Sequence, residues 1–323
     1  MTELDWMQEY AAAEMVELRD AGVLSRRDML VRLVAICGSV SAATAFLAAC
    51  GNDSAKSTSP TTSRAPDGGG TTTSSVAAKP PVTGGPPGHV LSVAATDPDV
   101  KAANVTFPGP ASTTLGYLAR PAAPGKYPAV LVNHEIFGLT DHIRDVARRL
   151  AKVGYLALAV DLVSRAGGSD KPGVDIVGGL FGGSIDDRVD DLNAGVTFLE
   201  SQPDYNGKLG VIGFCFGGGM TLSFAAANGK VSAAVSYYGP TPEPAAVMRA
   251  TKAAILGQYG GDDARVNAGI PALEAALAGK TFEKKIYDGA GHAFNNDTGG
   301  AYNEAAAVQA WAATTDWLST HLS

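Results

Sequence analysis

The sequence predicts an α/β fold in which helices cover both faces of a mostly parallel central sheet. From about residue 90 onward, short apolar runs alternate with segments of helical periodicity, which is typical of such a sheet. Several runs are continuously apolar, as expected for strands buried on both faces. With 46% hydrophobic and 18% charged residues among 323, the chain is not a wholly disordered protein.

We expect one domain over residues 89–323, with strands and helices in regular alternation. Strands are predicted at residues 115–118, 129–132, 155–160, 209–212, 233–237, 254–259 and 282–287. The first helix follows Thr140 or Asp141, either of which could cap it, and further helices are predicted at residues 185–200, 218–227, 271–278 and 303–318.

Residues 1–50 resemble a twin-arginine export signal joined to a lipobox. Arg26 and Arg27 precede the uncharged run 33–49, which ends in small residues before Cys50. The alternative is a transmembrane anchor, but 17 residues rich in Ala, Ser and Gly are short and weakly apolar for one. We therefore expect export by the twin-arginine machinery to the cell envelope and lipidation of Cys50. The product would be tethered to the membrane or secreted, and residues 1–50 would not be part of the folded domain.

Residues 51–88 are expected to form a disordered tether between that signal and the domain. Of these 38 positions, 26 are Gly, Pro, Ser or Thr. Such a segment buries too little apolar surface to offset the entropy lost on ordering. It should act as a flexible spacer.

The most informative segment is the strand that runs into Gly213-Phe-Cys215-Phe-Gly217. A nucleophile on a tight strand-to-helix turn needs small residues two positions before and after it, and this segment places sulfur in that position. The helix N-terminus beyond the turn would lower the pKa of the thiol and stabilise an oxyanion. The alternatives are a buried structural cysteine and a glycine-rich phosphate loop, but the Lys-Ser/Thr of the latter is missing.

Candidate partners for Cys215 follow it in the chain. His292 lies in a glycine-rich loop just after a predicted strand, whereas His321 is two residues from the end. Asp262 and Asp263 both end another strand, and either could orient the imidazole. The residues alone leave this choice open.

Taken together, these segments resemble the dienelactone hydrolase family, a branch of the α/β-hydrolase fold. The matching pieces lie at residues 133–139, 154–162, 210–218, 237–239, 260–263 and 289–294, in the expected order. The resemblance implies an ester or lactone hydrolase with a triad of Cys215, Asp263 and His292, working through a thioester.

The same resemblance assigns further residues to the site. It implies a catalytic Glu135, and an oxyanion hole made by the backbone N–H groups of Phe216 and Ile136. Glu135 also follows a buried strand, at the sheet edge where α/β proteins build their sites. A carboxylate there would oppose thiolate formation until substrate displaces it.

The expected substrate is a small-molecule ester or lactone that is uncharged or anchored differently from dienelactone. The family binds the carboxylate of dienelactone with arginines, and one of those positions is Asn296 in this chain. Arg165 remains a candidate substrate-binding residue, with a surface role as its alternative.

Rival functions are a catalytically silent ligand-binding lipoprotein of the same fold and a redox role for a single thiol. An acidic net charge of −7 argues against nucleic acid, and three cysteines cannot form a disulfide framework. The five histidines do not pair with acids at ligand spacing. We expect no metal, no cofactor and a monomer.

Overall fold

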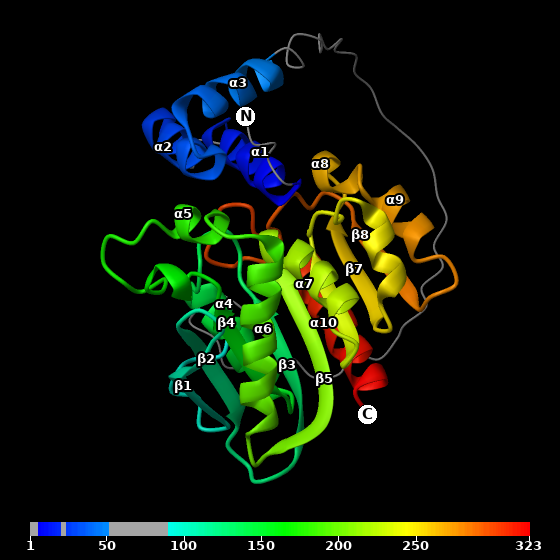
Figure 1. Ribbon diagram of the computed structural model, residues 1–323. Helices are drawn as coiled ribbons and strands as arrows, with labels where there is room; N and C mark the ends of the chain where they lie inside the picture. Colours follow the sequence, from blue (N-terminus) through cyan, green and yellow to red (C-terminus); the bar gives the residue numbers. More distant parts are fainter. Residues whose placement is uncertain (1–5, 21–23, 52–89) are drawn as a thin grey trace, which may run out of the picture.

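The computed structural model describes residues 6–20, 24–51 and 90–323 (Figure 1). An eight-stranded sheet forms the centre, in the order β1-β2-β4-β3-β5-β6-β7-β8. The strands are β1 (Val100–Pro108), β2 (Thr113–Pro121), β3 (Tyr127–Asn133), β4 (Leu156–Asp161), β5 (Tyr205–Phe214), β6 (Val231–Tyr237), β7 (Ala254–Gly260) and β8 (Phe282–Tyr287). The β1–β2 and β2–β4 pairs are antiparallel and the other five pairs are parallel, so the predicted mostly parallel sheet is confirmed.

Helices cover both faces of this sheet. The helices α6 (Ile185–Glu200) and α7 (Phe216–Ala227) lie on the face toward the viewer in Figure 1, and α4 (Asp141–Lys152) and α10 (Glu304–His321) lie behind it. The predicted helix after Thr140 is α4, and its apolar face, which includes Ile143 and Val146, is buried against the sheet. Because β3 and β4 are covered on both sides, their apolar runs are continuous rather than alternating.

The remaining elements are short or lie at the edge of the sheet. They are α5 (Ile176–Phe181), α8 (Ala264–Asn267), α9 (Ile270–Ala276) and the two 3₁₀ turns η2 (Ser164–Ala166) and η3 (Ala245–Ala250). Our strand prediction missed β1, because an edge strand with half-exposed residues carries no apolar run. It also missed α5, whose two glycines disfavour a helix.

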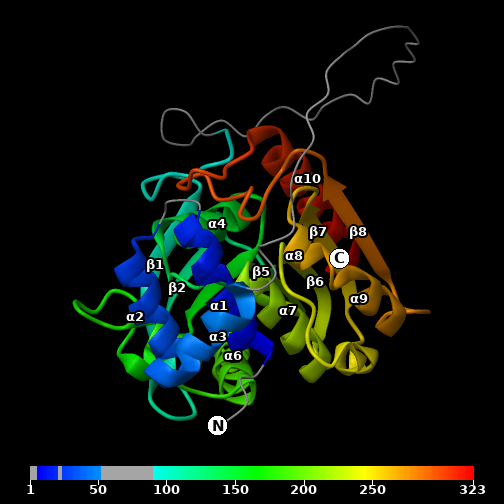
Figure 2. The ribbon, with the colours of Figure 1, turned by 90° about the horizontal axis from the view of Figure 1, so that it is seen from above.

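Three N-terminal helices pack on the end of the domain near α5, α7 and α8 (Figures 1 and 2). They are α1 (Trp6–Asp20), α2 (Arg26–Cys37) and α3 (Val40–Gly51). We expected residues 1–50 to lie outside the folded domain, and the structure differs here. The reason is the buried stripe on α1, in which Met7, Tyr10, Ala11 and Met15 recur at helical spacing.

The export signal itself stays a prediction. The side chain of Cys50 and residues 52–88 of the expected tether lie outside the described residues. In the described ranges no single helix is long and apolar enough to cross a membrane, and one sharply bent pair, α2 with α3, reaches the required length and composition together.

Candidate active site

Cys215 occupies a strained turn between β5 and α7. Its backbone has φ 55° and ψ −124°, a conformation that residues with a side chain rarely adopt. A Cβ added to Gly213 would lie 2.0 Å from the carbonyl oxygen of Gly217. A Cβ on Gly217 would lie 2.3 Å from the carbonyl oxygen of Asn133 at the end of β3. The two glycines are therefore required by the close approach of backbones at this turn.

The structure brings the three predicted triad residues together. Nδ1 of His292 lies 2.6 Å from Oδ2 of Asp263, and a ring nitrogen of His292 lies within 4.8 Å of the sulfur of Cys215. Asp263 is buried and also caps α8 by accepting from the N–H of Val266. The neighbouring Asp262 is exposed. This geometry leaves Asp263 as the carboxylate that orients the imidazole.

Burial and charge set the protonation of this group. Burial raises the pKa of the Cys215 thiol, and the Glu14 carboxylate of α1 raises it further, while His292 acts in the opposite sense. For His292, burial opposes the charged ring, yet Glu14, Cys215 and the hydrogen bond to Asp263 hold its pKa well above the usual value. The covered site therefore disfavours ionisation of the thiol and favours the charged form of the imidazole.

Glu135 is buried beside the same group. Nδ2 of Asn296 donates a 2.8 Å hydrogen bond to its Oε2, and burial raises the pKa of its carboxyl group. Nδ1 of His134 lies 2.6 Å from the carbonyl oxygen of Glu135, and its Nε2 accepts from the N–H of Leu162 at 3.1 Å. His134 thus fixes the loop after β3 against the end of β4.

The two residues predicted to form the oxyanion hole lie at the start of α7 and in the loop after β3. Phe216 is the first residue of α7, where an N–H has no partner within the helix. Ile136 belongs to the loop after β3, which the close approach of Gly217 to Asn133 presses against the start of α7. Both residues are buried. Their role in holding an oxyanion stays a prediction.

The loop that carries His292 is anchored to α4. Five residues after the histidine, Asp297 pairs with Arg149 and lies 3.0 Å from Nδ1 of His142. Ser92 donates to the same carboxylate. Burial opposes ionisation, yet the His142 hydrogen bond and the Arg149 charge hold the pKa of Asp297 well below its usual value. The histidine loop is therefore tied to the rest of the domain by a buried charged network.

Helix α1 covers the site, which sequence reasoning did not anticipate. The hydroxyl of Tyr10 lies 3.5 Å from the sulfur of Cys215 and 3.3 Å from Nε2 of His292. Under this helix Cys215 is only 3% exposed. The sequence signal that could have revealed this helix is the stripe formed by residues 7, 10, 11, 14 and 15 at helical spacing. An export signal does not require such a stripe before its paired arginines.

Family comparisons match the part of the chain that carries these residues. The model of the dienelactone hydrolase family matches residues 114–322. The chain belongs to the dienelactone hydrolase family. It is 36% identical over 233 residues to a protein of Methylorubrum extorquens named "Putative carboxymethylenebutenolidase", covering 67% of this chain and 80% of that protein. It is thus a hydrolase of the carboxylic-ester class.

Solved structures show the same α/β-hydrolase fold. A protein of Klebsiella pneumoniae named "Putative Dienelactone Hydrolase" is 32% identical with a TM-score of 0.63, and the match covers 68% of this chain and 98% of that one. An esterase from Pyrobaculum calidifontis, 17% identical with a TM-score of 0.53 over 69% of this chain and 87% of its own, shares the fold. The family model matches residues 114–322 and thus lies wholly outside α1–α3.

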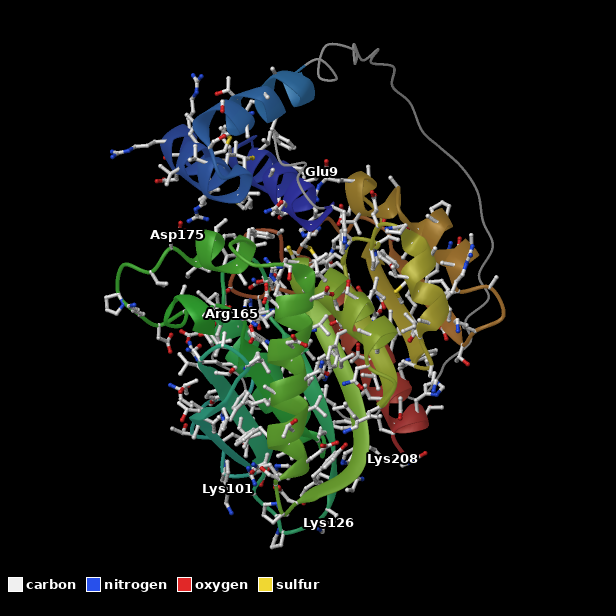
Figure 3. All side chains as sticks on the ribbon, in the orientation of Figure 1. Glu9, Lys101, Lys126, Arg165, Asp175 and Lys208 are labelled. Carbon is white, nitrogen blue, oxygen red and sulfur yellow. The ribbon has the colours of Figure 1, made fainter. Side chains whose placement is uncertain are left out.

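The structure does not bring Arg165 to the thiol. Arg165 lies beside α6 (Figure 3), where its guanidinium pairs with Asp187 and Asp191. Two carboxylates thus already neutralise the cation that we considered for substrate binding. Its proposed contact with an anionic substrate has no support from this geometry.

One group of side chains at the site has the composition of a metal site. Donor atoms of Glu14, Cys215 and His292 lie within 4.8 Å of one another. The Glu14 carboxylate, however, is already paired with the guanidinium of Arg265, which would repel a cation at this place. We therefore interpret the group as an ion-paired cover over the thiol.

Proposed function

We propose that this protein hydrolyses a small ester or lactone through Cys215, His292 and Asp263, in a form from which α1 has left the site. The observation that carries the proposal is the strained turn at Cys215, which holds the sulfur at the start of α7 with the imidazole–carboxylate pair beside it. This arrangement supplies a nucleophile, a base and the group that orients the base.

The chemistry follows from these positions. His292 takes the thiol proton, and the sulfur of Cys215 attacks the carbonyl carbon of the substrate. The N–H groups of Phe216 and Ile136 hold the resulting oxyanion. The carbon–oxygen bond to the leaving group then breaks, His292 returns its proton to that oxygen, and a thioester remains. Water activated by His292 hydrolyses the thioester and restores the thiol.

Glu135 controls the resting state of the thiol in this proposal. Burial raises the pKa of Cys215 most, and like-charge repulsion from the Glu135 carboxylate adds to it, so thiolate formation is disfavoured before substrate binds. Asn296 holds the carboxylate by one neutral hydrogen bond. A substrate that displaces Glu135 from the sulfur would thus also ionise the nucleophile.

The predicted export signal provides a way to uncover the site. Cleavage before Cys50 would remove α1, α2 and nearly all of α3, and with them Tyr10 and Glu14. Twin-arginine export carries folded proteins, so the chain would be covered while it folds and open after cleavage. Lipidation of Cys50 would then tether the open enzyme through residues 51–88.

Activity of the chain lacking residues 1–50 tests this function. We expect hydrolysis of activated aryl esters and lactones, and an acylated Cys215 that mass spectrometry detects after rapid quenching. The variant Cys215→Ala of the same shortened chain should lose turnover. Turnover that survives Cys215→Ala, or a folded protein that binds these esters without cleaving them, would refute the proposal in favour of a binding protein.

A further inference from the structure

We propose that the cavity between α4 and α10 is an effector site. It binds a neutral, largely apolar molecule whose carbonyl oxygen accepts a hydrogen bond from Nη1 of Arg149, and the occupant holds the loop of His292 in place. None of the residues that line this cavity belongs to the predicted triad or oxyanion hole. Such a site would exist whether or not Cys215 is a nucleophile.

The cavity lies on the face of the sheet that α4 and α10 cover (Figure 1). It has a volume of about 570 Å³, and its apolar lining includes Leu91 and the buried rings of Tyr155 and Trp311. Val90 and Val308, also in the lining, are 45% and 38% exposed. A volume of this size with a mainly apolar lining is typical of sites for small apolar ligands.

One polar atom in this lining has no partner. The side chain of Arg149 is 1% exposed, and its Nε and Nη2 donate to Asp145. Its Nη2 also contacts Asp297 and Ser92. Nη1 is buried and has no hydrogen-bond partner among the described residues. A buried donor without an acceptor is unfavourable, so a ligand oxygen that reaches Nη1 would bind favourably.

The charges around the cavity favour a neutral acceptor over an anion. The two cations of the lining, Arg149 and Lys152, are both paired with aspartates. Two further residues of the lining, Glu304 and Asp316, are exposed acids. A carboxylate on the ligand would therefore meet charges of its own sign. A carbonyl oxygen satisfies Nη1 without adding a charge.

An occupant would be joined through Arg149 to the loop of His292. The same guanidinium pairs with Asp297, which lies five residues after the histidine. A ligand that binds only while Arg149 keeps this position stabilises the folded arrangement of which it is a part. Occupancy of the cavity should therefore oppose local opening of the histidine loop.

Prodan, 6-propionyl-2-(dimethylamino)naphthalene, is the probe for a test on the full chain, because it is neutral and apolar and carries one ketone. We expect saturable binding, with emission that shifts to shorter wavelength as the dye leaves water. The 6-propyl analogue has CH₂ in place of the carbonyl and should displace prodan about 10- to 100-fold less well, the factor for a hydrogen bond to a charged donor. Equal displacement by the analogue and by unlabelled ketone, or no saturable binding, would overturn the proposal.

Two variants of α10 establish where the probe binds without disturbing the ion pairs of Arg149. Ala312→Phe fills the cavity from an exposed position in its lining and should abolish prodan binding. Ala305→Phe places the same side chain at an exposed position outside the lining and should change the affinity by less than about twofold. Thermal melting shows whether both variants fold. Folded Ala312→Phe protein that binds prodan as the parent does would refute this site.

Hydrogen exchange tests the link to the histidine loop. With prodan at about ten times its dissociation constant, exchange of the backbone amides in residues 293–298 of the full chain should slow by about tenfold. The same addition to Ala312→Phe should have no effect. Exchange that stays unchanged in the parent while the cavity is saturated would refute the effector role.

Discussion

Replacing Gly217 with alanine should disable the site through the backbone that it touches. The added Cβ would lie 2.3 Å from the carbonyl oxygen of Asn133 and 2.5 Å from that of His134. Both atoms belong to the backbone, so they cannot rotate away as a flexible side chain would. The loop after β3 must therefore move by about 1 Å to reach ordinary contact.

That loop carries Glu135 and the N–H of Ile136, so the displacement reaches the reacting atoms. A misplacement of about 1 Å costs on the order of 100-fold in rate, which corresponds to about 2.7 kcal/mol of transition-state stabilisation. We expect kcat/KM of Gly217→Ala for an aryl ester to fall by this factor in the chain lacking residues 1–50. Overpacking should also cost about 1–3 kcal/mol of stability.

A second glycine at the other end of α7 provides the control. A Cβ on Gly229 would meet no atom closer than 4.0 Å, so Gly229→Ala should keep both activity and stability. Thermal melting followed by circular dichroism separates loss of fold from loss of rate. A folded Gly217→Ala protein with the activity of the parent would refute the idea that this contact positions the loop.

Three other predictions concern the cover and the histidine loop. Deleting residues 1–50 should speed alkylation of Cys215 by iodoacetamide about 100-fold. This is the factor expected if uncovering the thiol in the full chain requires exposing Tyr10, at a cost of about 2–3 kcal/mol. Equal rates in the two chains would contradict the conclusion that α1 covers the thiol. In the full chain, Glu14→Gln should lower the pKa of the Cys215 thiol, so that alkylation begins at lower pH, whereas Glu17→Gln should not. Asp297→Asn should lower the free energy of unfolding by about 3 kcal/mol at neutral pH. The pKa of Asp297 is depressed in the folded state, so its stabilisation is present above the unfolded value near about 4 and is lost as pH falls toward the folded value. Chemical denaturation should therefore show that the difference in free energy of unfolding between the parent and Asp297→Asn disappears only in acid.

Sequence patterns predicted the sheet well, because each buried strand carries a run that only a covered parallel sheet explains. The site could be predicted for a similar reason. Gly213 and Gly217 reveal the turn around Cys215, since backbone contact excludes any side chain at those two positions. Constraints that act within one short segment of chain can therefore be recognised from the residues of that segment.

Contacts between distant segments could not be recognised in this way. The cover depends on Tyr10 and Glu14 meeting residues more than 200 positions away, and the stripe on α1 says that the helix is buried without saying where. The partner of Arg265 was hidden for the same reason. The position of Arg265 two residues after Asp263 does not show which carboxylate it pairs with, because its partners lie on α1.

The anchoring of Asp297 also limits how this enzyme can be recombined with its relatives. Its carboxylate is shared by Ser92 and by His142 and Arg149 of α4, so two separate stretches of chain meet behind the loop that carries His292. A chimera that imported only the segment around His292 could bury Asp297 without Arg149 and His142, or these two residues without the carboxylate that pairs with them. A successful exchange would have to transfer the loop of His292 together with α4 and the segment around Ser92.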